Sequence, residues 1–207
     1  MEQEKSIIPA IVTRCIQEVE LRGRLSTIQT FPRETNLSSF SGMDMEGIYR
    51  KSGASSITQM IRDGFERSPL DYDISDPDLD IHAVTSALKQ YFRKLPTPLI
   101  TYDVYDEFLE TNEIEPASAR IEALQKCLQK LPRVHRDVLE FLMFHLKRVV
   151  EREPENLMTS QNLAVVFAPT IMRPESLARE MTDVQKKNEA LKFLVENCQE
   201  VFMGLQG

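Results

Sequence analysis

The sequence is organised around residues 46–53, Glu46-Gly47-Ile48-Tyr49-Arg50-Lys51-Ser52-Gly53, a turn-rich segment between predicted helices. Both glycines can adopt backbone angles closed to other residues, so we expect an exposed loop with Ile48 and Tyr49 anchored in the core and Arg50 pointing outward. A planar, permanently charged guanidinium is suited to phosphate oxygens and to charge that develops during phosphoryl transfer. Taken alone, the segment favours an ordinary surface arginine, because most loop arginines contact only water.

Amphipathic helices are predicted on both sides of this segment. Their apolar spacing and flanking turn residues place them over residues 6–21, 56–68, 81–94, 102–111, 117–130, 133–152, 160–168 and 176–202. Ser56 and Gln59 predict a capping box, Asp80 predicts an N-cap, and Pro169 is expected to end the helix that begins at Ser160. No segment alternates with period two for long enough to indicate a sheet. The predicted fold is therefore an all-α helical bundle.

Length and composition indicate one soluble globular domain over residues 1–207. Residues 24–44 are rich in Ser, Thr, Asn, Pro and Gly and are expected to form a long, flexible loop. No apolar run approaches the roughly 18 residues that a membrane span needs, and the chain does not begin with a secretory signal. The net charge of -7 argues against nucleic acid as the main partner.

Neither the cysteines nor the aspartates predict a metal site. The three cysteines, Cys15, Cys127 and Cys198, each lie in an apolar helical pattern, which favours reduced structural thiols in a cytosolic protein. The acidic run 71–78 lacks the glycine and closing glutamate of an EF-hand loop. The three histidines are scattered without ligand spacing, so structural roles are expected for them.

Three polar residues on the predicted helices admit two interpretations each. Lys89 and Arg93 lie one turn apart beside an apolar stripe, an arrangement typical of a solvated surface but also of a helix that binds an anionic partner. Asn162 stands at the head of an almost wholly apolar turn, where either a local backbone bond or a partner could satisfy its amide.

Three motifs together resemble the RhoGAP domain, also called the breakpoint cluster region homology domain. They are residues 46–53 (EGIYRKSG), residues 87–100 (ALKQYFRKLPTPLI) and residues 162–170 (NLAVVFAPT). Their order and spacing cover nearly the whole chain, and residues 141–146 (FLMFHL) are similar to the chimaerin type. The resemblance implies an all-α RhoGAP bundle of about eight to nine helices.

The resemblance also implies a role for each matching residue. Arg50 falls where the family places its arginine finger, so 46–53 is the expected finger loop. Lys89 and Arg93 fall where the family places basic residues beside the finger, and Asn162 and Pro169 where it contacts the GTPase switch regions. The implied function is stimulation of GTP hydrolysis by a GTP-bound Rho, Rac or Cdc-type GTPase, with Arg50 supplied in trans. Such a domain is an activator without a complete active site, so no cofactor or metal is expected.

Two departures from the family pattern bear on this expectation. The chain has about twenty extra residues between Gly23 and Met45, where the family passes to the arginine loop in a few. Ala168 stands where the family has glycine, so its methyl group is expected to alter the contact made by Pro169.

Two other function classes remain open at this point. One is a scaffold that binds a GTPase without stimulating it; the other is a helical adaptor that binds an unrelated protein through apolar grooves. We expect a cytoplasmic, monomeric domain without membrane insertion, recruited to membranes or cytoskeleton by domains outside this chain. The preferred GTPase is not identified by the sequence.

Overall fold

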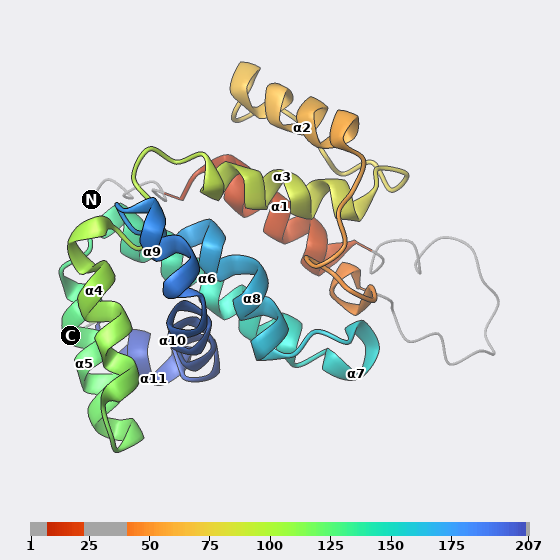
Figure 1. Ribbon diagram of the computed structural model, residues 1–207. Coiled ribbons are helices and arrows are strands. Elements are labelled where there is room, and N and C mark those ends of the chain that lie inside the picture. Colours follow the sequence, from red (N-terminus) through yellow and green to blue (C-terminus); the bar gives the residue numbers. More distant parts are fainter. Residues whose placement is uncertain (1–7, 23–40, 206–207) are drawn as a thin grey trace, which may run out of the picture. The chain divides into compact units, whose positions relative to one another are not determined.

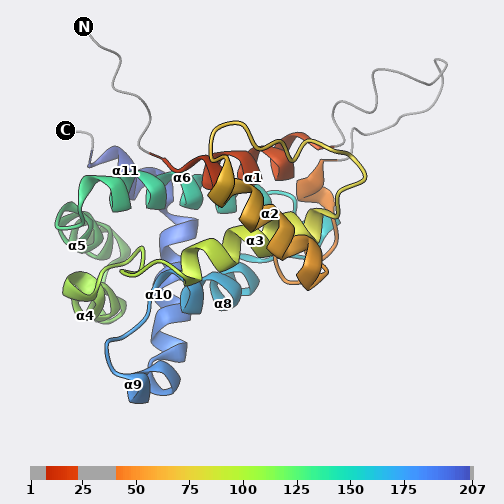
Figure 2. The same cartoon turned by 90° about the horizontal axis from the view of Figure 1, so that it is seen from above.

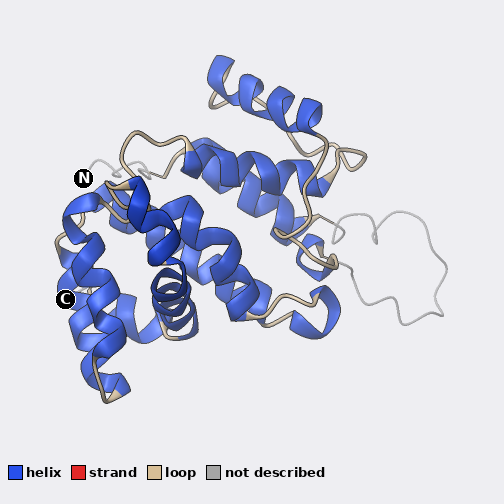
Figure 3. Ribbon diagram, viewed as in Figure 1, coloured by secondary structure: helices blue, strands red, loops and turns tan. Residues whose placement is uncertain are grey.

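The computed structural model describes residues 8–22 and 41–205, and every regular element in those residues is helical (Figures 1 and 3). The α-helices are α1 (Ala10–Leu21), α2 (Ser55–Arg67), α3 (Ile81–Arg93), α4 (Tyr102–Glu110), α5 (Ala117–Gln129), α6 (Arg133–Val150), α7 (Glu153–Asn156), α8 (Ser160–Ile171), α9 (Leu177–Thr182), α10 (Val184–Glu196) and α11 (Cys198–Met203). Two 3-10 turns, η2 (Gly42–Asp44) and η3 (Thr111–Glu113), complete the set. The predicted all-α fold is confirmed.

The chain divides into two compact units, each built from separate stretches of sequence. Among the described residues, the N-unit comprises those within 9–91 and 148–159, and the C-unit comprises residues 92–147 and 160–205, together with Ile8. The chain therefore passes between the units within α3 and within α6. The single domain over 1–207 stays a prediction.

In the N-unit, apolar residues at helical spacing form the core. Fully or almost fully buried side chains come from α1, the loop after η2, α2 and α3: Val12, Cys15, Ile16, Val19, Ile48, Tyr49, Ile61, Val84 and Leu88. The α3 helix begins as predicted, because the Asp80 carboxylate accepts a hydrogen bond from the His82 amide at 2.9 Å. The element η2 packs against both α1 and α7.

In the C-unit, α10 is the central helix and lies between α4 and α8 (Figures 1 and 2). Its buried residues face those of α8, among them Leu163, Phe167 and Ile171 at a spacing of four residues. The helix α5 packs against α4 and α11. Ile100 and Met172 form one isolated parallel bridge, in which the Ile100 amide donates to the Ile171 carbonyl at 2.9 Å.

Several predicted boundaries are wrong, each for a local reason. The helix at 160 does not end at Pro169 but runs to Ile171, because a proline late in a helix costs only one backbone bond when the surrounding core holds the last turn. The capping box at Ser56 is absent, because Ser55 is already helical and Ala54 is the N-cap. The single helix over 176–202 is three helices, separated at Asp183 and Asn197.

The predicted loop 24–44 is described only at its end. Residues 24–40 lie outside the described residues, as does the beginning of the helix predicted from Ser6. Ser41 to Asp44 differ from the expected irregular loop, because Ser41 and Asp44 form a reciprocal capping box around η2. Gly42 and Met43 are buried against α1, and a methyl group on Gly42 would lie 2.7 Å from the Val19 carbonyl oxygen.

Candidate functional site

The arginine loop, residues 46–53, joins η2 to α2 in the N-unit. Ile48 and Tyr49 have no solvent exposure, whereas Arg50 beside them is exposed. This change from two buried residues to an exposed one confirms the predicted burial. Ile48 and Tyr49 anchor the loop in the core immediately before Arg50. The Arg50 side chain therefore starts from a fixed backbone position and extends into solvent.

Two left-handed residues shape the loop. Gly47 has φ of 71°, as its residue type favours, but Tyr49 has φ of 68°, which a bulky residue rarely adopts. The Arg50 and Lys51 amides both donate to the Gly47 carbonyl at 2.9 Å, which closes a tight turn around Ile48 and Tyr49. The strain at Tyr49 is typical of functional loops and requires support from its surroundings.

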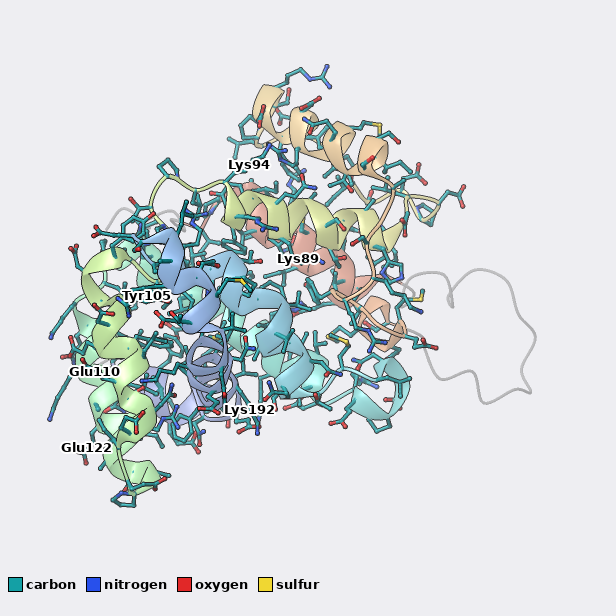
Figure 4. The ribbon with its side chains drawn as sticks, in the orientation of Figure 1. Lys89, Lys94, Tyr105, Glu110, Glu122 and Lys192 are labelled. Atoms are coloured by element: carbon teal, nitrogen blue, oxygen red, sulfur yellow. The ribbon has the colours of Figure 1, made fainter. Side chains whose placement is uncertain are left out.

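Lys89 supplies part of that support. It lies on α3 (Figure 4) and its Nζ donates a hydrogen bond to the Tyr49 carbonyl oxygen, the backbone group directly before Arg50. Burial lowers the pKa of the Lys89 ammonium. Neither interpretation of the helix spacing described this contact, whereas the resemblance implied a position for Lys89 beside the finger. The half-buried lysine turns toward the arginine loop of its own chain.

Gly53 serves a different purpose from the one predicted. Its φ is not in the left-handed region, so glycine is needed here because it has no side chain rather than for its backbone conformation. A methyl group at this position would lie 2.2 Å from the Ala83 amide nitrogen, and the Gly53 amide donates to the Ser86 hydroxyl at 3.3 Å. The end of the arginine loop thus lies directly against the first turns of α3.

Asn156, at the end of α7, is a loop-supporting residue that the sequence analysis missed. Its carbonyl accepts a hydrogen bond from the Gly47 amide at 2.8 Å, and the residue is fully buried. The only signal in the sequence is an asparagine in a polar turn, which is ordinary at a surface. By contrast, the ion pair of Lys51 with Glu46 across the loop, at 3.1 Å, is exposed and contributes little.

The remaining predicted residues belong to the C-unit. Arg93 is the exposed last residue of α3. Behind it, the Arg173 guanidinium donates to the Arg93 carbonyl and, at 2.6 Å, to the Leu95 carbonyl. A cation at a helix C-terminus satisfies free carbonyls and interacts favourably with the helix dipole. The backbone that carries Arg93 is therefore fixed within the C-unit.

Asn162 and Pro169 lie on α8, seven residues apart and so on the same side of the helix. Both are partly exposed, and Val165, between them in the sequence, is 51% exposed although it is apolar. Asn162 is therefore not the buried asparagine that the apolar surroundings suggested. Ala168 is fully buried, so its methyl group packs inside the C-unit rather than on this surface.

The five predicted site residues are thus divided between the units. Arg50 and Lys89 are brought together in the N-unit, whereas Arg93, Asn162 and Pro169 belong to the C-unit. No group of three or more His, Cys, Asp or Glu residues with metal-binding geometry occurs in the described chain. The three cysteines are free and buried, as predicted, and burial raises the pKa of each thiol. Among the described helices, none is long and apolar enough to cross a membrane.

Comparison with known proteins assigns the family. The model of the RhoGAP domain matches residues 36–176, which include the arginine loop, α3 and α8. The chain belongs to the RhoGAP family.

The relatives of this RhoGAP chain include chimaerins, as the sequence motifs indicated. Rat beta-chimaerin is 38% identical over 194 residues, covering 91% of this chain and 59% of the relative. Human N-chimaerin is 38% identical over 192 residues, covering 91% of this chain and 38% of the relative. A probable Rho-type GTPase-activating protein 4 from Schizosaccharomyces pombe is 40% identical over 165 residues, 78% of this chain and 17% of the relative. The chain thus spans between 17% and 59% of the length of these relatives.

Solved structures of the family share the fold. Human Rho GTPase activating protein 15 aligns with a TM-score of 0.78 at 31% identity, covering 97% of this chain and 87% of that structure. The BH domain of GRAF, the GTPase regulator associated with focal adhesion kinase, aligns with a TM-score of 0.74 at 29% identity, covering 94% and 93%.

Proposed function

We propose that this RhoGAP chain accelerates GTP hydrolysis by a Rho-family small GTPase in its GTP-bound state, with Arg50 as an arginine finger inserted in trans. The observation that carries the proposal is an exposed arginine directly after two fully buried residues, in a loop with internal anchors. A finger must project into a partner while its backbone stays in place. A solvated surface arginine has no need of such support.

The proposed chemistry follows from the charge that develops during phosphoryl transfer. As the bond between the γ-phosphoryl group and the leaving GDP breaks, negative charge grows on the phosphate oxygens. The GTPase alone stabilises this charge poorly. The Arg50 guanidinium donates hydrogen bonds to those oxygens and holds the glutamine of the GTPase over the attacking water. Arginine fingers contribute roughly 10³ to 10⁵ in rate. GTP, magnesium and water belong to the GTPase, so this chain acts as an activator.

The other predicted residues have supporting roles in this proposal. Lys89 fixes the carbonyl before Arg50 and so sets the starting point of the finger. Arg93, Asn162 and Pro169 contact the switch regions of the GTPase, Arg93 through acidic residues and the α8 pair through a half-exposed polar and apolar face. The domain acts as a monomer, because each GTPase needs one arginine.

The test is single-turnover GTP hydrolysis by representative Rho, Rac and Cdc-type GTPases, with the parent chain and with Arg50→Ala. The variant is expected to lose most of the stimulation and keep much of the binding, because the finger acts mainly on the transition state. Arg67→Ala is the matched control, since Arg67 is exposed on α2, where its Nε donates to the Asp63 carbonyl. Full activity of Arg50→Ala would exclude the finger assignment.

The same assay separates the competing functions. Binding of a GTPase without acceleration by the parent chain would establish a scaffold of this fold. Binding of neither the GTP-bound nor the GDP-bound GTPases would favour an adaptor for an unrelated protein.

A further inference from the structure

Asn156 uses every polar group of its side chain inside the N-unit. Its Nδ2 donates to the Met43 carbonyl and to the Val149 carbonyl, both at 2.8 Å, and its Oδ1 accepts from the Met158 amide at 2.7 Å. With the bond from the Gly47 amide to its own carbonyl, the residue joins the end of α6, the turn η2 and the arginine loop. No solvent reaches it.

These bonds reach Arg50 in two steps. The Gly47 amide donates to the Asn156 carbonyl at 2.8 Å, and the Gly47 carbonyl accepts from the Arg50 amide at 2.9 Å. Asn156 also binds Met43, so it holds the chain on both sides of the exposed residues Met45 and Glu46. The entry of the arginine loop is thereby fixed in two places.

Asn156 is itself held by its neighbours. The Val149 carbonyl, at the end of α6, fixes the amide group, and Leu157 follows in a left-handed conformation with φ of 58°. The side-chain bond to the Met158 amide closes a local turn of the kind that asparagine favours. The support for the loop is therefore anchored at the end of a long helix, α6.

We propose that Asn156 is a positioning residue for Arg50. It fixes the backbone at the start of the arginine loop, so that the guanidinium is already oriented for the transition state when the GTPase binds. The inference rests on the proposed function. Lys89 binds the loop at Tyr49, directly before the arginine, and Asn156 binds it at Gly47, where the loop begins. Between these two contacts the backbone of residues 47–49 is fixed at both ends.

The alternative is a purely structural asparagine, whose loss lowers the folded fraction without changing the catalytic step. The two roles differ in what a substitution does to folded protein. A positioning role lowers the stimulated rate at saturating domain concentration and leaves GTPase affinity nearly unchanged. A structural role lowers the active concentration and leaves the rate per folded molecule unchanged.

The test uses Asn156→Ser, which keeps a small polar group but cannot donate to Met43 and Val149 together. Single-turnover hydrolysis is measured at saturating domain, and affinity for the GTPase loaded with a non-hydrolysable GTP analogue is measured separately. We expect the saturating rate to fall about 10- to 100-fold, the size typical of misplacing a catalytic group. In an Arg50→Ala background the same substitution is expected to cause no further fall, because its effect passes through the guanidinium.

Lys187→Met is the stability control. Lys187 is buried in the C-unit and pairs with Glu180 at 3.0 Å, so its replacement perturbs folding and changes no residue of the N-unit, which carries the arginine loop. Its rate per folded molecule is expected to match the parent. An equal fall in the Arg50→Ala background, or a parental rate for folded Asn156→Ser, would overturn the inference.

Amide hydrogen exchange in the parent chain provides a test that needs no variant. The Gly47 amide is expected to be as strongly protected as the Met158 amide, because both donate to Asn156. Fast exchange at Gly47 beside slow exchange at Met158 would contradict a fixed loop entry. A parent chain that stimulates no GTPase refutes the proposed function itself, whereas a stimulating parent with a fully active Asn156→Ser refutes only the role of Asn156.

Discussion

Replacing Lys89 by methionine isolates the contact that holds the carbonyl before Arg50. Methionine keeps most of the apolar stem on α3 but cannot donate to the Tyr49 carbonyl. A hydrogen bond with one charged partner contributes about 1.5 to 3 kcal/mol, and the left-handed Tyr49 stores a comparable strain of about 1 to 3 kcal/mol. The loop is therefore expected to leave its geometry when this bond is lost.

The expected effect on activity follows from the lower part of that range, because Lys89 is half-buried. A loss of about 2 kcal/mol in positioning Arg50 corresponds to about a 30-fold fall in stimulated hydrolysis, since each 1.4 kcal/mol is about tenfold. Binding of the GTPase is expected to weaken by a smaller factor. The thermal midpoint is expected to move little, because burial of the ammonium, which lowers its pKa, no longer costs free energy.

The assay is single-turnover hydrolysis with thermal unfolding measured on the same samples. Lys192→Met is the matched control, because Lys192 is a half-exposed lysine on α10 (Figure 4) whose Nζ only weakly approaches Glu196, at 3.9 Å. Parental stimulation by Lys89→Met would refute the argument. So would a loss that is equally large when Arg50 is already alanine.

Two further predictions concern stability. Gly53→Ala is expected to destabilise the chain by more than about 2 kcal/mol in urea unfolding, because the new methyl group would lie 2.2 Å from the Ala83 amide nitrogen. Gly204→Ala is the milder control, because its methyl group would contact only the end of the flexible Gln125 side chain. Burial raises the pKa of the Cys127 thiol from 9.0 to about 12, so the unfolded state loses this proton at lower pH than the folded state. The free energy of unfolding is therefore expected to fall as pH rises from about 9 toward 12, by up to about 1.4 kcal/mol per pH unit. Cys127→Ala should flatten that dependence, and an unchanged slope would contradict the prediction.

The parts of the fold that apolar spacing controls could be predicted from the sequence. The buried face of α3, with Ile81, Val84, Leu88 and Phe92, is found as expected, because one helical period decides which residues avoid water. Boundaries were less predictable. Ser56 is a competent cap, yet the N-cap is Ala54, two residues earlier, since the preceding loop already packs against α3 through Gly53.

The candidate site shows the same division between local and distant causes. The exposure of Arg50 directly after two buried residues follows from the local pattern and could be predicted. The support of its loop depends on Asn156, more than one hundred positions later in the sequence, whose partners are backbone carbonyls and amides. Backbone partners leave no pairing pattern in the side chains, so a single sequence carries no sign of them.

The hydrogen bonds of Arg173 have a consequence for how a partner would meet the C-unit. Arg173 follows α8 by two residues and binds the carbonyls of Arg93 and Leu95, while the Ile100 amide binds the Ile171 carbonyl at the end of α8. The end of α3 and the end of α8 are thus joined by direct bonds on both sides of the proline-rich turn. Folding has already restricted the motion of these two helix ends relative to each other. A partner that contacted both Arg93 and Pro169 would therefore lose less conformational entropy on binding.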